Sequence, residues 1–297
     1  MNSPATGRDK LMAVRKPSTL SPFRYPGGKT RLRTTIIDWI SELGFRPTHF
    51  IEPFAGGASV GLAIAELDLA DHVTLAEIDP DVSAVWDVVL NGQASELARQ
   101  IRTFDLNNAT AAEISAAVPT NQLARAFGCL LLNRISRSGI MAPGAGWLNE
   151  GENGRGIHSR WYPKTLSARI ESANALREKV SFVQCDGLGL LGEFAHDRRV
   201  VAFVDPPYVV NGRGAGLRLY THHDVDCERL FKVIEHFVGA MVITYHRSVV
   251  VERLADQAGI ERRTITVQTG HKKKKRELIM FKTPSKRKRK KGVRAKY

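Results

Sequence analysis

The chain has 297 residues, 43% of them hydrophobic, which is enough to bury one large core or two smaller ones. No run of about 18 apolar residues occurs, so we expect no membrane span, and the absence of an apolar signal core near the N-terminus favours a cytoplasmic protein. The three cysteines are scattered without a CxxC pair, which argues against a disulfide framework or a zinc site.

The net charge of +14 is concentrated at the C-terminal end. Residues 271–297 contain fourteen Lys or Arg and one acidic residue, which give +13, whereas residues 1–270 contain 30 basic and 29 acidic residues, which give +1. A run this dense binds phosphate backbones by releasing counterions. We therefore expect residues 284–297 to form a disordered basic tail that contacts nucleic acid. A tail that serves only solubility is the alternative.

Residues 1–20 are expected to be a flexible lead, followed by the segment SPFRYPGGKTRL at 21–32. Two glycines and Lys29 precede a helical pattern that begins near Thr30, and such a segment lets backbone N–H groups approach an anion. It is not a Walker A loop, because the first glycine of that motif would fall at Phe23. A nucleotide triphosphate is disfavoured, and a nucleoside-like ligand with a carboxylate remains open.

The stretch Thr48–Glu52 is typical of a strand, and Gly56 and Gly57 predict a tight turn into a helix of small residues at Ala58–Leu67. The GxGxxG fingerprint of dinucleotide-binding folds is absent, but a single nucleoside at the helix N-terminus is compatible with this turn. A turn that needs glycine only for its geometry is the alternative.

The next predicted strand, His72–Ala76, ends at Glu77. An acidic side chain at this position can accept hydrogen bonds from ribose hydroxyls. Glu77 follows the apolar run directly and is the preferred residue. Asp79 is also available, or it caps the helix that begins near Pro80.

Helical patterns then dominate, at Ala94–Phe104, Ala111–Val118, Asn121–Ile135 and Leu166–Lys179. Between the last two lies Ser138–Pro163, which holds six glycines and two tryptophans. Arginines lie in this segment or just before it: Arg134, Arg137, Arg155 and Arg160. A long Gly-rich loop with interleaved arginines and aromatics favours contact with nucleic acid, and a mobile linker is the alternative.

A further predicted strand, Val180–Gln184, leads to Asp186, the third acidic residue to follow a strand. The apolar run Val200–Val204 then predicts a strand buried on both faces of a parallel sheet. Each of these strands belongs to the pattern of an open α/β sheet, whose ligands bind beyond the carboxyl ends of the strands.

Asp205, Pro206, Pro207 and Tyr208 follow the buried strand directly. Proline ends the strand and keeps the preceding residue extended, so the carboxylate and the ring have a fixed relation. A flat substrate that carries an exocyclic amine fits this corner: the ring stacks on its face, while the carboxylate and a backbone carbonyl accept its N–H groups. A Pro-rich turn with an incidental aspartate is the alternative.

The composition of Val209–His223 predicts a mobile lid or a loop that orders on binding. Further elements are predicted at Asp224–Val238 (helix), Ala240–Tyr245 (strand), Val249–Gln257 (helix), Arg262–Val267 (strand) and Glu277–Phe281 (strand). His222, His223 and Asp224 are adjacent, but no further ligand set has matching spacing, so we interpret them as the start of a helix. The Ser, Cys and His residues show no arrangement for nucleophilic catalysis.

Taken in order, the chain resembles the Dam-like (class alpha) DNA adenine-N6 methyltransferases. The motifs that carry the resemblance are PFRYPGGK, FIEPFAGGASV, LAEIDPD, LNRISRSG, QCDG, DPPY, ITYH and KKKRELIMF, which span most of residues 21–283. The resemblance implies a Rossmann-like α/β fold, a seven-stranded methyltransferase sheet with a helical target-recognition insertion. Its catalytic domain would comprise residues 21–94 and 180–283, and the insertion residues 95–179.

The resemblance also implies S-adenosylmethionine as the cofactor and a monomer in solution that acts on double-stranded DNA without a membrane. The implied cofactor-binding residues are Tyr25, Lys29, Glu52, Phe54, Gly56, Glu77 and Asp186. Asp205, Pro206, Pro207 and Tyr208 match the catalytic motif, which would grip a flipped-out adenine. Arg134, Arg137, Arg155 and Arg160 would contact the DNA.

Two other interpretations stay open from the sequence alone. The same fold could methylate cytosine N4, an adenine in RNA or a protein amide nitrogen, because the pocket chemistry is nearly the same for each. A DNA-binding protein without catalysis is the alternative from another class, and the intact acid, prolines and tyrosine argue against it.

Overall fold

A computed structural model describes residues 17–24, 29–141, 146–149, 154–207, 225–268 and 274–284. Tyr25, Tyr208 and the predicted lid lie outside the described residues, as do residues 1–16 and the tail from residue 285 onward. Asp205, Pro206, Pro207 and the other six predicted cofactor-binding residues lie within them.

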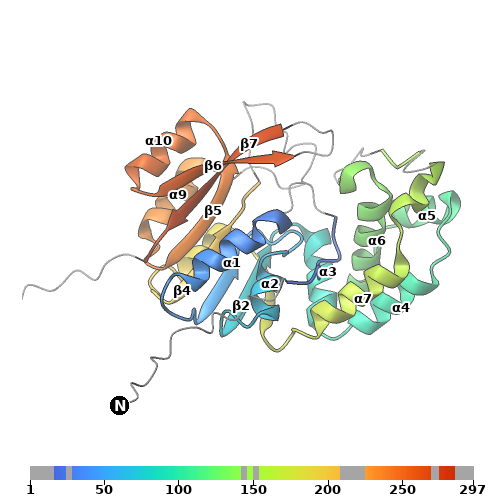
Figure 1. Cartoon of the computed structure of the whole chain (residues 1–297). Coiled ribbons are helices and arrows are strands. Elements are labelled where there is room, and N and C mark those ends of the chain that lie inside the picture. The colour runs from blue at the N-terminus through green and yellow to red at the C-terminus, as the bar shows by residue number, and fades with distance from the viewer. Residues whose placement is uncertain are drawn as a thin grey trace, which may run out of the picture.

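The fold is built on a seven-stranded sheet with the order β3-β2-β1-β4-β5-β7-β6 (Figure 1). The strands are β1 (His49–Glu52), β2 (His72–Glu77), β3 (Val180–Gln184), β4 (Val200–Val204), β5 (Ala240–His246), β6 (Glu261–Gln268) and β7 (Lys274–Lys282). The first five are parallel, and β7 is antiparallel to both β5 and β6. Because the strand order reverses beside β1, the crevice between the carboxyl ends of β1 and β4 is the topological switch point.

Helices cover both faces of the sheet (Figure 1). They are α1 (Arg33–Ser41), α2 (Gly61–Glu66), α3 (Pro80–Leu90), α4 (Ala94–Thr103), α5 (Asn108–Ala116), α6 (Gln122–Ile135), α7 (Pro163–Asn174), α8 (Gly187–Glu193), α9 (Cys227–His236) and α10 (Val249–Gln257). Successive strand residues point to opposite faces. Phe50 and Val201 thus join the core layer of α1 to α3, while Ile51 and Val200 join that of α8 to α10.

Helices α4 to α7 form a separate group beside α3, on the side of the molecule away from α9 and α10 (Figure 1). Here α6 packs against α3 and α7 packs against α4. The Ser167 hydroxyl on α7 donates to the carbonyl oxygen of Ala98 on α4 at 3.0 Å. This group occupies the predicted insertion at residues 95–179.

The architecture confirms the predicted Rossmann-like sheet, although several helices differ from their predicted bounds. Helix α7, for example, begins three residues and ends five residues before its predicted limits. Helix α8 was not predicted, because three of its seven residues are glycine. It forms because Asp186 caps it by accepting a hydrogen bond from the Leu188 N–H at 3.2 Å. Helix α5 begins three residues before the predicted start, because Asn107 and Thr110 form a capping box.

Three further findings bear on the function. Within the described residues, no helix is long and apolar enough to cross a membrane. The part of the chain that the structure describes contains no group of three or more residues that could hold a metal ion. Cys129, Cys185 and Cys227 are free thiols.

Two glycines of α8 provide a matched test of the packing of this helix against the loop after β1. A Cβ atom at Gly187 would lie 2.2 Å from the Pro53 carbonyl oxygen, whereas Gly189 has open space around it. We expect Gly187→Ala to lower the free energy of unfolding by about 1–3 kcal/mol, and Gly189→Ala to raise it by about 0.5–1 kcal/mol. Denaturant titration measures both, and equal stabilities of the two variants would contradict this packing.

Candidate active site

Two acidic residues lie at the switch point of the sheet. Glu52 is the last residue of β1, and Asp205 directly follows β4, which pairs with β1 in parallel. Burial raises the pKa of Glu52, and the charge of Asp205 raises it further, so the two carboxyl groups lie close enough to interact. The crevice where ligands bind in open α/β sheets is therefore lined by acids.

The Asp205 carboxylate is held on one of its two oxygens. The Thr244 hydroxyl from β5 donates to Oδ1 at 2.5 Å, and the Lys29 ammonium lies 3.0 Å from the same oxygen. Within the described residues, neither of these contacts uses Oδ2, and 22% of the side chain is exposed. The second oxygen can therefore accept a hydrogen bond from a ligand.

Lys29 joins Asp205 to a second carboxylate. Its ammonium nitrogen lies 3.4 Å from Oε2 of Glu277 on β7, and both side chains are buried. Burial lowers the pKa of Lys29, but the two carboxylates outweigh burial and raise this pKa above its ordinary value. Lys29 is therefore a buried cation at neutral pH.

The pKa of Asp205 reflects a balance of opposing effects. Burial raises it, the Lys29 charge and the Thr244 hydrogen bond lower it, and the Glu277 charge raises it, with a net increase over the ordinary value. Because ionised aspartate is the better hydrogen-bond acceptor, activity that depends on Asp205 should fall as pH decreases through this raised pKa.

The Glu52 side chain is buried, with 3% of the residue exposed. Its Oε2 accepts a hydrogen bond from the Gly61 N–H at 2.6 Å, and a Cβ atom at Gly61 would lie only 2.7 Å from that oxygen. Burial raises the pKa of Glu52 to about 8. The carboxyl group is therefore mostly protonated at pH 7, and a cation bound nearby would favour its ionised form.

The glycine loop is fastened to the end of β2 through Glu77. The two Glu77 oxygens accept hydrogen bonds from the backbone N–H groups of Gly56 at 3.0 Å, Ile78 at 2.9 Å and Asp79 at 3.1 Å. On the other side, the Trp86 indole donates to the Gly56 carbonyl at 2.7 Å. Gly56 has φ +45° in the left-handed region, a conformation that glycine adopts most readily.

Asp186 and Phe54 form the neighbouring wall. Asp186 caps α8 through Oδ1, and its Oδ2 lies 3.1 Å from the Arg229 guanidinium of α9. The Phe54 ring lies next to Gly187, where a Cβ atom would be 3.1 Å from the ring. Asp79 caps α3 by accepting hydrogen bonds from the backbone N–H groups of Asp81 and Val82. This is the capping role, one of the two roles that the sequence allowed for Asp79.

The segment that precedes Lys29 is clamped by the helical insertion. Asn133 of α6 accepts a hydrogen bond from the Arg24 N–H at 2.8 Å and donates to the carbonyl oxygens of Arg24 and Gly139, each at 3.0 Å. Gly139 has φ +75°, and a Cβ atom there would lie 2.3 Å from the Arg24 carbonyl. One buried amide thus connects the insertion, the Gly-rich loop and the segment leading to the crevice.

A sequence model of the D12 class N6 adenine-specific DNA methyltransferases matches residues 25–268. The chain belongs to this family. The D12 class methyltransferase described here is therefore an S-adenosylmethionine-dependent enzyme that methylates N6 of adenine in DNA. The matched range contains Lys29, Glu52, Glu77, Asp186 and Asp205.

Two solved structures that resemble this D12 methyltransferase share little sequence with it. A candidate RNA methyltransferase from Pyrococcus horikoshii is 12% identical to this chain, with a TM-score of 0.42. The match covers 93% of this chain and 95% of the Pyrococcus chain. The precorrin-6y C5,15-methyltransferase from Geobacter metallireducens is 10% identical, with a TM-score of 0.38. This match covers 86% of this chain and 88% of the Geobacter chain. No curated protein matches the chain in sequence.

The crevice of the D12 methyltransferase has the chemistry that S-adenosylmethionine requires. The sulfonium is cationic, and Glu52 and Asp205 place acids at the switch point. The ribose hydroxyls need acceptors, and Glu77 retains acceptor capacity because two carboxylate oxygens offer about four lone-pair sites. The acids therefore fit the cofactor.

The four arginines predicted to contact DNA occupy different environments. Arg137 and Arg155 are exposed, Arg160 is half-buried, and Arg134 is only 5% exposed. The Arg134 guanidinium donates to the Pro22 carbonyl oxygen. Burial and this backbone hydrogen bond are incompatible with the DNA contact that we predicted for Arg134, so we keep only the other three as proposed DNA contacts.

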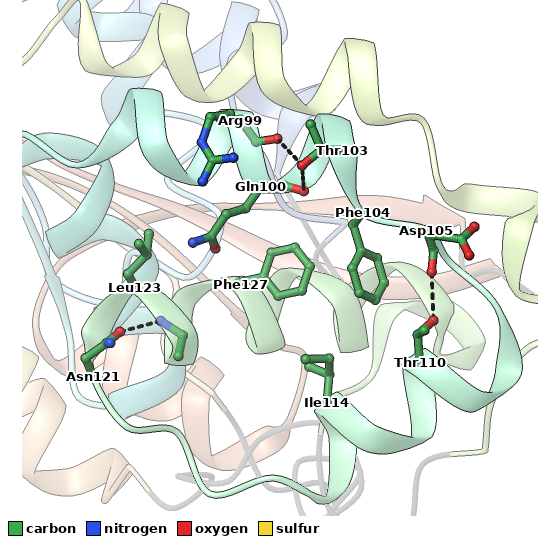
Figure 2. Close-up of a pocket in the computed structure, with 11 residues that line it drawn as sticks. Arg99, Gln100, Thr103, Phe104, Asp105, Thr110, Ile114, Asn121, Leu123 and Phe127 are labelled. Carbon is green, nitrogen blue, oxygen red and sulfur yellow. Dashed lines mark hydrogen bonds between the residues drawn. The ribbon is translucent and has the colours of Figure 1, made fainter.

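A pocket of about 520 Å³ lies in the insertion, remote in sequence from the crevice residues. Figure 2 shows Phe104, Ile114 and Phe127 lining it between α4, α5 and α6. Its polar residues serve the helices themselves: Asn121 caps α6, and Thr110 donates to the Asp105 carbonyl at 2.8 Å. None of the predicted site residues lines this pocket.

Three residues of the site were not predicted: Thr244, Glu277 and Asn133. Each lies in a motif that carried the resemblance, namely ITYH, KKKRELIMF and LNRISRSG. Glu277 and Thr244 had a readable signal, because each is a polar residue within or beside a run of apolar strand residues. The strand pairing, which the sequence does not give, brings Thr244 to Asp205 and Glu277 to Lys29.

The fit of Glu77 to the cofactor can be tested by Glu77→Gln. The glutamine amide would place a donor against a backbone N–H group and disturb the glycine loop. We expect the affinity for S-adenosylmethionine to fall about 10- to 100-fold, as for the loss of a hydrogen bond to a charged group. Calorimetric titration measures this. Glu113→Gln on the exposed face of α5 is the control, and equal affinities of the two variants would contradict the assignment.

Proposed function

We propose that this DNA adenine methyltransferase flips its target adenine out of the duplex and binds the N6 amine at Oδ2 of Asp205. The observation that carries the proposal is the asymmetry of the carboxylate. Thr244 and Lys29 both contact Oδ1, which orients Oδ2 as the acceptor for a ligand. Flipping is required because N6 cannot be reached inside a stacked duplex.

The corner after β4 has a separate task for each residue. The Asp205 carboxylate and the Pro206 carbonyl each accept one N–H of the amine, which withdraws the nitrogen lone pair from conjugation with the ring. The prolines keep the backbone extended and stiff, and the Tyr208 ring stacks on the base. The amine is thereby more nucleophilic and fixed in direction, which accounts for much of the rate.

In our proposal, S-adenosylmethionine binds beside this corner, at the end of β1. When bound, S-adenosylmethionine supplies an electrophilic methyl carbon on a cationic sulfur. Glu77 accepts from the ribose hydroxyls, while Glu52, Phe54 and Gly56 shape the pocket floor. Tyr25, Lys29 and Asp186 complete its walls, and Glu52, whose ionised form a bound cation favours, stabilises the positive charge.

The DNA lies across the insertion and the crevice in this proposal. A second pocket, of about 480 Å³, is lined by residues that include Trp147, Asn149, Arg155 and His158, which suit stacking and phosphate contact. Burial lowers the pKa of Arg24, and the nearby charge of Arg160 lowers it further. Together with Arg137, these cations form a basic path from the Gly-rich loop to the segment before Lys29.

We further propose that the enzyme acts as a monomer in the cytoplasm, where it reaches cellular DNA. Its catalytic domain comprises residues 21–94 and 180–283, its target-recognition insertion residues 95–179. The predicted flexible lead does not extend over Ser18, whose N–H donates to Oε2 of Glu66 at 2.8 Å and whose carbonyl oxygen accepts from Arg33 at 2.6 Å. Residues 284–297 serve as a basic tail in this proposal. The packing of α4 against α7 beside α3 supports the insertion boundaries.

Asp205→Ala tests the proposed role of Oδ2. We expect methyl transfer to fall about 100-fold or more, while the affinity for S-adenosylmethionine stays within a few-fold of the wild type. Sequencing of DNA from cells that express each protein, with detection of modified bases, identifies both the acceptor base and its sequence context. Methylation at a near wild-type level by Asp205→Ala would show that another group binds the amine.

Removal of residues 284–297 tests the role of the tail. Eight basic residues are lost, so the slope of the logarithm of DNA affinity against the logarithm of salt concentration should flatten by up to about 7. Base preference should be unchanged. A tail with every Lys and Arg replaced by Gln is the matched control for length. An unchanged slope in both variants would exclude the tail from DNA binding.

A further inference from the structure

Glu277 is a buried acidic residue that the proposed chemistry does not use. It is 3% exposed and lies in β7, where the next four residues, Leu278 to Phe281, are all buried and apolar. A carboxylate in such a strand is costly unless an opposite charge accompanies it. Oε2 of Glu277 lies 3.4 Å from the Lys29 ammonium, which is that charge.

The strand pairing brings Glu277 to the base of the catalytic corner. β7 pairs antiparallel with β5, so Glu277 faces His246 while Thr244 faces Ile279. Thr244 and Glu277 thus approach the Asp205–Lys29 pair from two neighbouring strands. Lys29 lies between the two carboxylates, 3.0 Å from Asp205 and 3.4 Å from Glu277.

The cluster holds more negative charge than a structural ion pair needs. One carboxylate is enough to neutralise the Lys29 ammonium, yet Asp205 and Glu277 both contact it. Glu52 is the other acid that interacts with Asp205, and burial raises its pKa to about 8, so it adds little charge at pH 7. The surplus negative charge is therefore that of the Asp205–Glu277 pair.

We propose that Glu277 is a positioning residue for methyl transfer, which holds the Lys29 ammonium at Oδ1 of Asp205 and keeps Oδ2 available to the amine. The inference rests on the proposed function of Asp205. With Glu277 3.4 Å away, the ammonium is attracted by two carboxylates at once. Without Glu277, a single carboxylate partner would attract the ammonium across both of its oxygens.

Glu277 also tunes the strength of the acceptor. Its charge raises the pKa of Asp205, whereas the Lys29 charge and the Thr244 hydrogen bond lower it. A more basic carboxylate accepts a stronger hydrogen bond. The orientation and the basicity of the Asp205 carboxylate therefore both depend on Glu277, which acts through Lys29 and does not contact the substrate.

Glu277→Gln tests the proposal, because it keeps the volume of the side chain and removes its charge. We expect kcat to fall about 10- to 100-fold, with the KM for DNA and the affinity for S-adenosylmethionine within about threefold of the wild type. Because the pKa of Asp205 decreases, the acid limb of the pH–rate profile should move to lower pH. Thr244→Val removes a contact that lowers this pKa, so its acid limb should move to higher pH.

A readout independent of activity separates this inference from the proposed function. In protein labelled with ¹³C at the aspartate carboxyl carbons, the resonance lost in Asp205→Asn belongs to Asp205. Its titration should shift to lower pH in Glu277→Gln and to higher pH in Thr244→Val. Wild-type protein that titrates as expected but does not methylate DNA would refute the function and leave the electrostatic coupling intact.

Two results would overturn the inference. One is a Glu277→Gln enzyme with wild-type kcat. The other is a loss of activity that accompanies a lower melting temperature while both the acid limb and the Asp205 titration stay unchanged, as a purely structural role predicts. If Glu277→Gln does not fold, Glu277→Asp provides the test, because it keeps the negative charge but moves the carboxylate away from Lys29. Its kcat and acid limb should change in the same directions by less, and unchanged values would equally contradict the proposal.

Discussion

The ion pair between Lys29 and Asp205 is the interaction on which the site depends. A carboxylate at the end of a buried strand is stable only if an opposite charge accompanies it. Here Lys29 and Thr244 both contact Oδ1 of Asp205, so Oδ2 stays available to a ligand. Each partner comes from a different element: Asp205 from β4, Thr244 from β5 and Lys29 from the segment before α1. The sheet thus determines both where the acid lies and which of its oxygens faces a ligand.

Close backbone approach is the second constraint. The loop after β1 must lie against β2 and β3 to form one wall of the crevice, so Gly61 contacts Glu52 and Gly187 contacts Pro53 at distances that leave no room for a side chain. Glu77 then fastens the loop through three backbone N–H groups. The glycine-rich motifs of the chain are required by this packing as much as by a ligand.

The fold and most of the site could be predicted from the sequence. Apolar runs that end in Glu52, Glu77, Asp186 and Asp205 mark the parallel strands and place their acids at one edge of the sheet. Helix α8 could not be predicted, because its glycines hide a helix that a cap and tertiary packing stabilise. Arg134 could not be placed either, because local sequence does not distinguish an arginine that binds a buried carbonyl from one that faces DNA. Contacts between segments far apart in the sequence, such as Glu277 with Lys29, depend on the strand order, which motifs alone do not predict.

The most direct measurement of the central claim is a crystal structure of the enzyme with S-adenosylhomocysteine and duplex DNA that contains its target adenine. The account predicts that N6 of the flipped base lies about 2.7–3.2 Å from Oδ2 of Asp205, while Lys29 and Thr244 remain on Oδ1. An adenine whose N6 contacts neither Asp205 nor the Pro206 carbonyl, or a Lys29 ammonium that has left Asp205 in the complex, would contradict it.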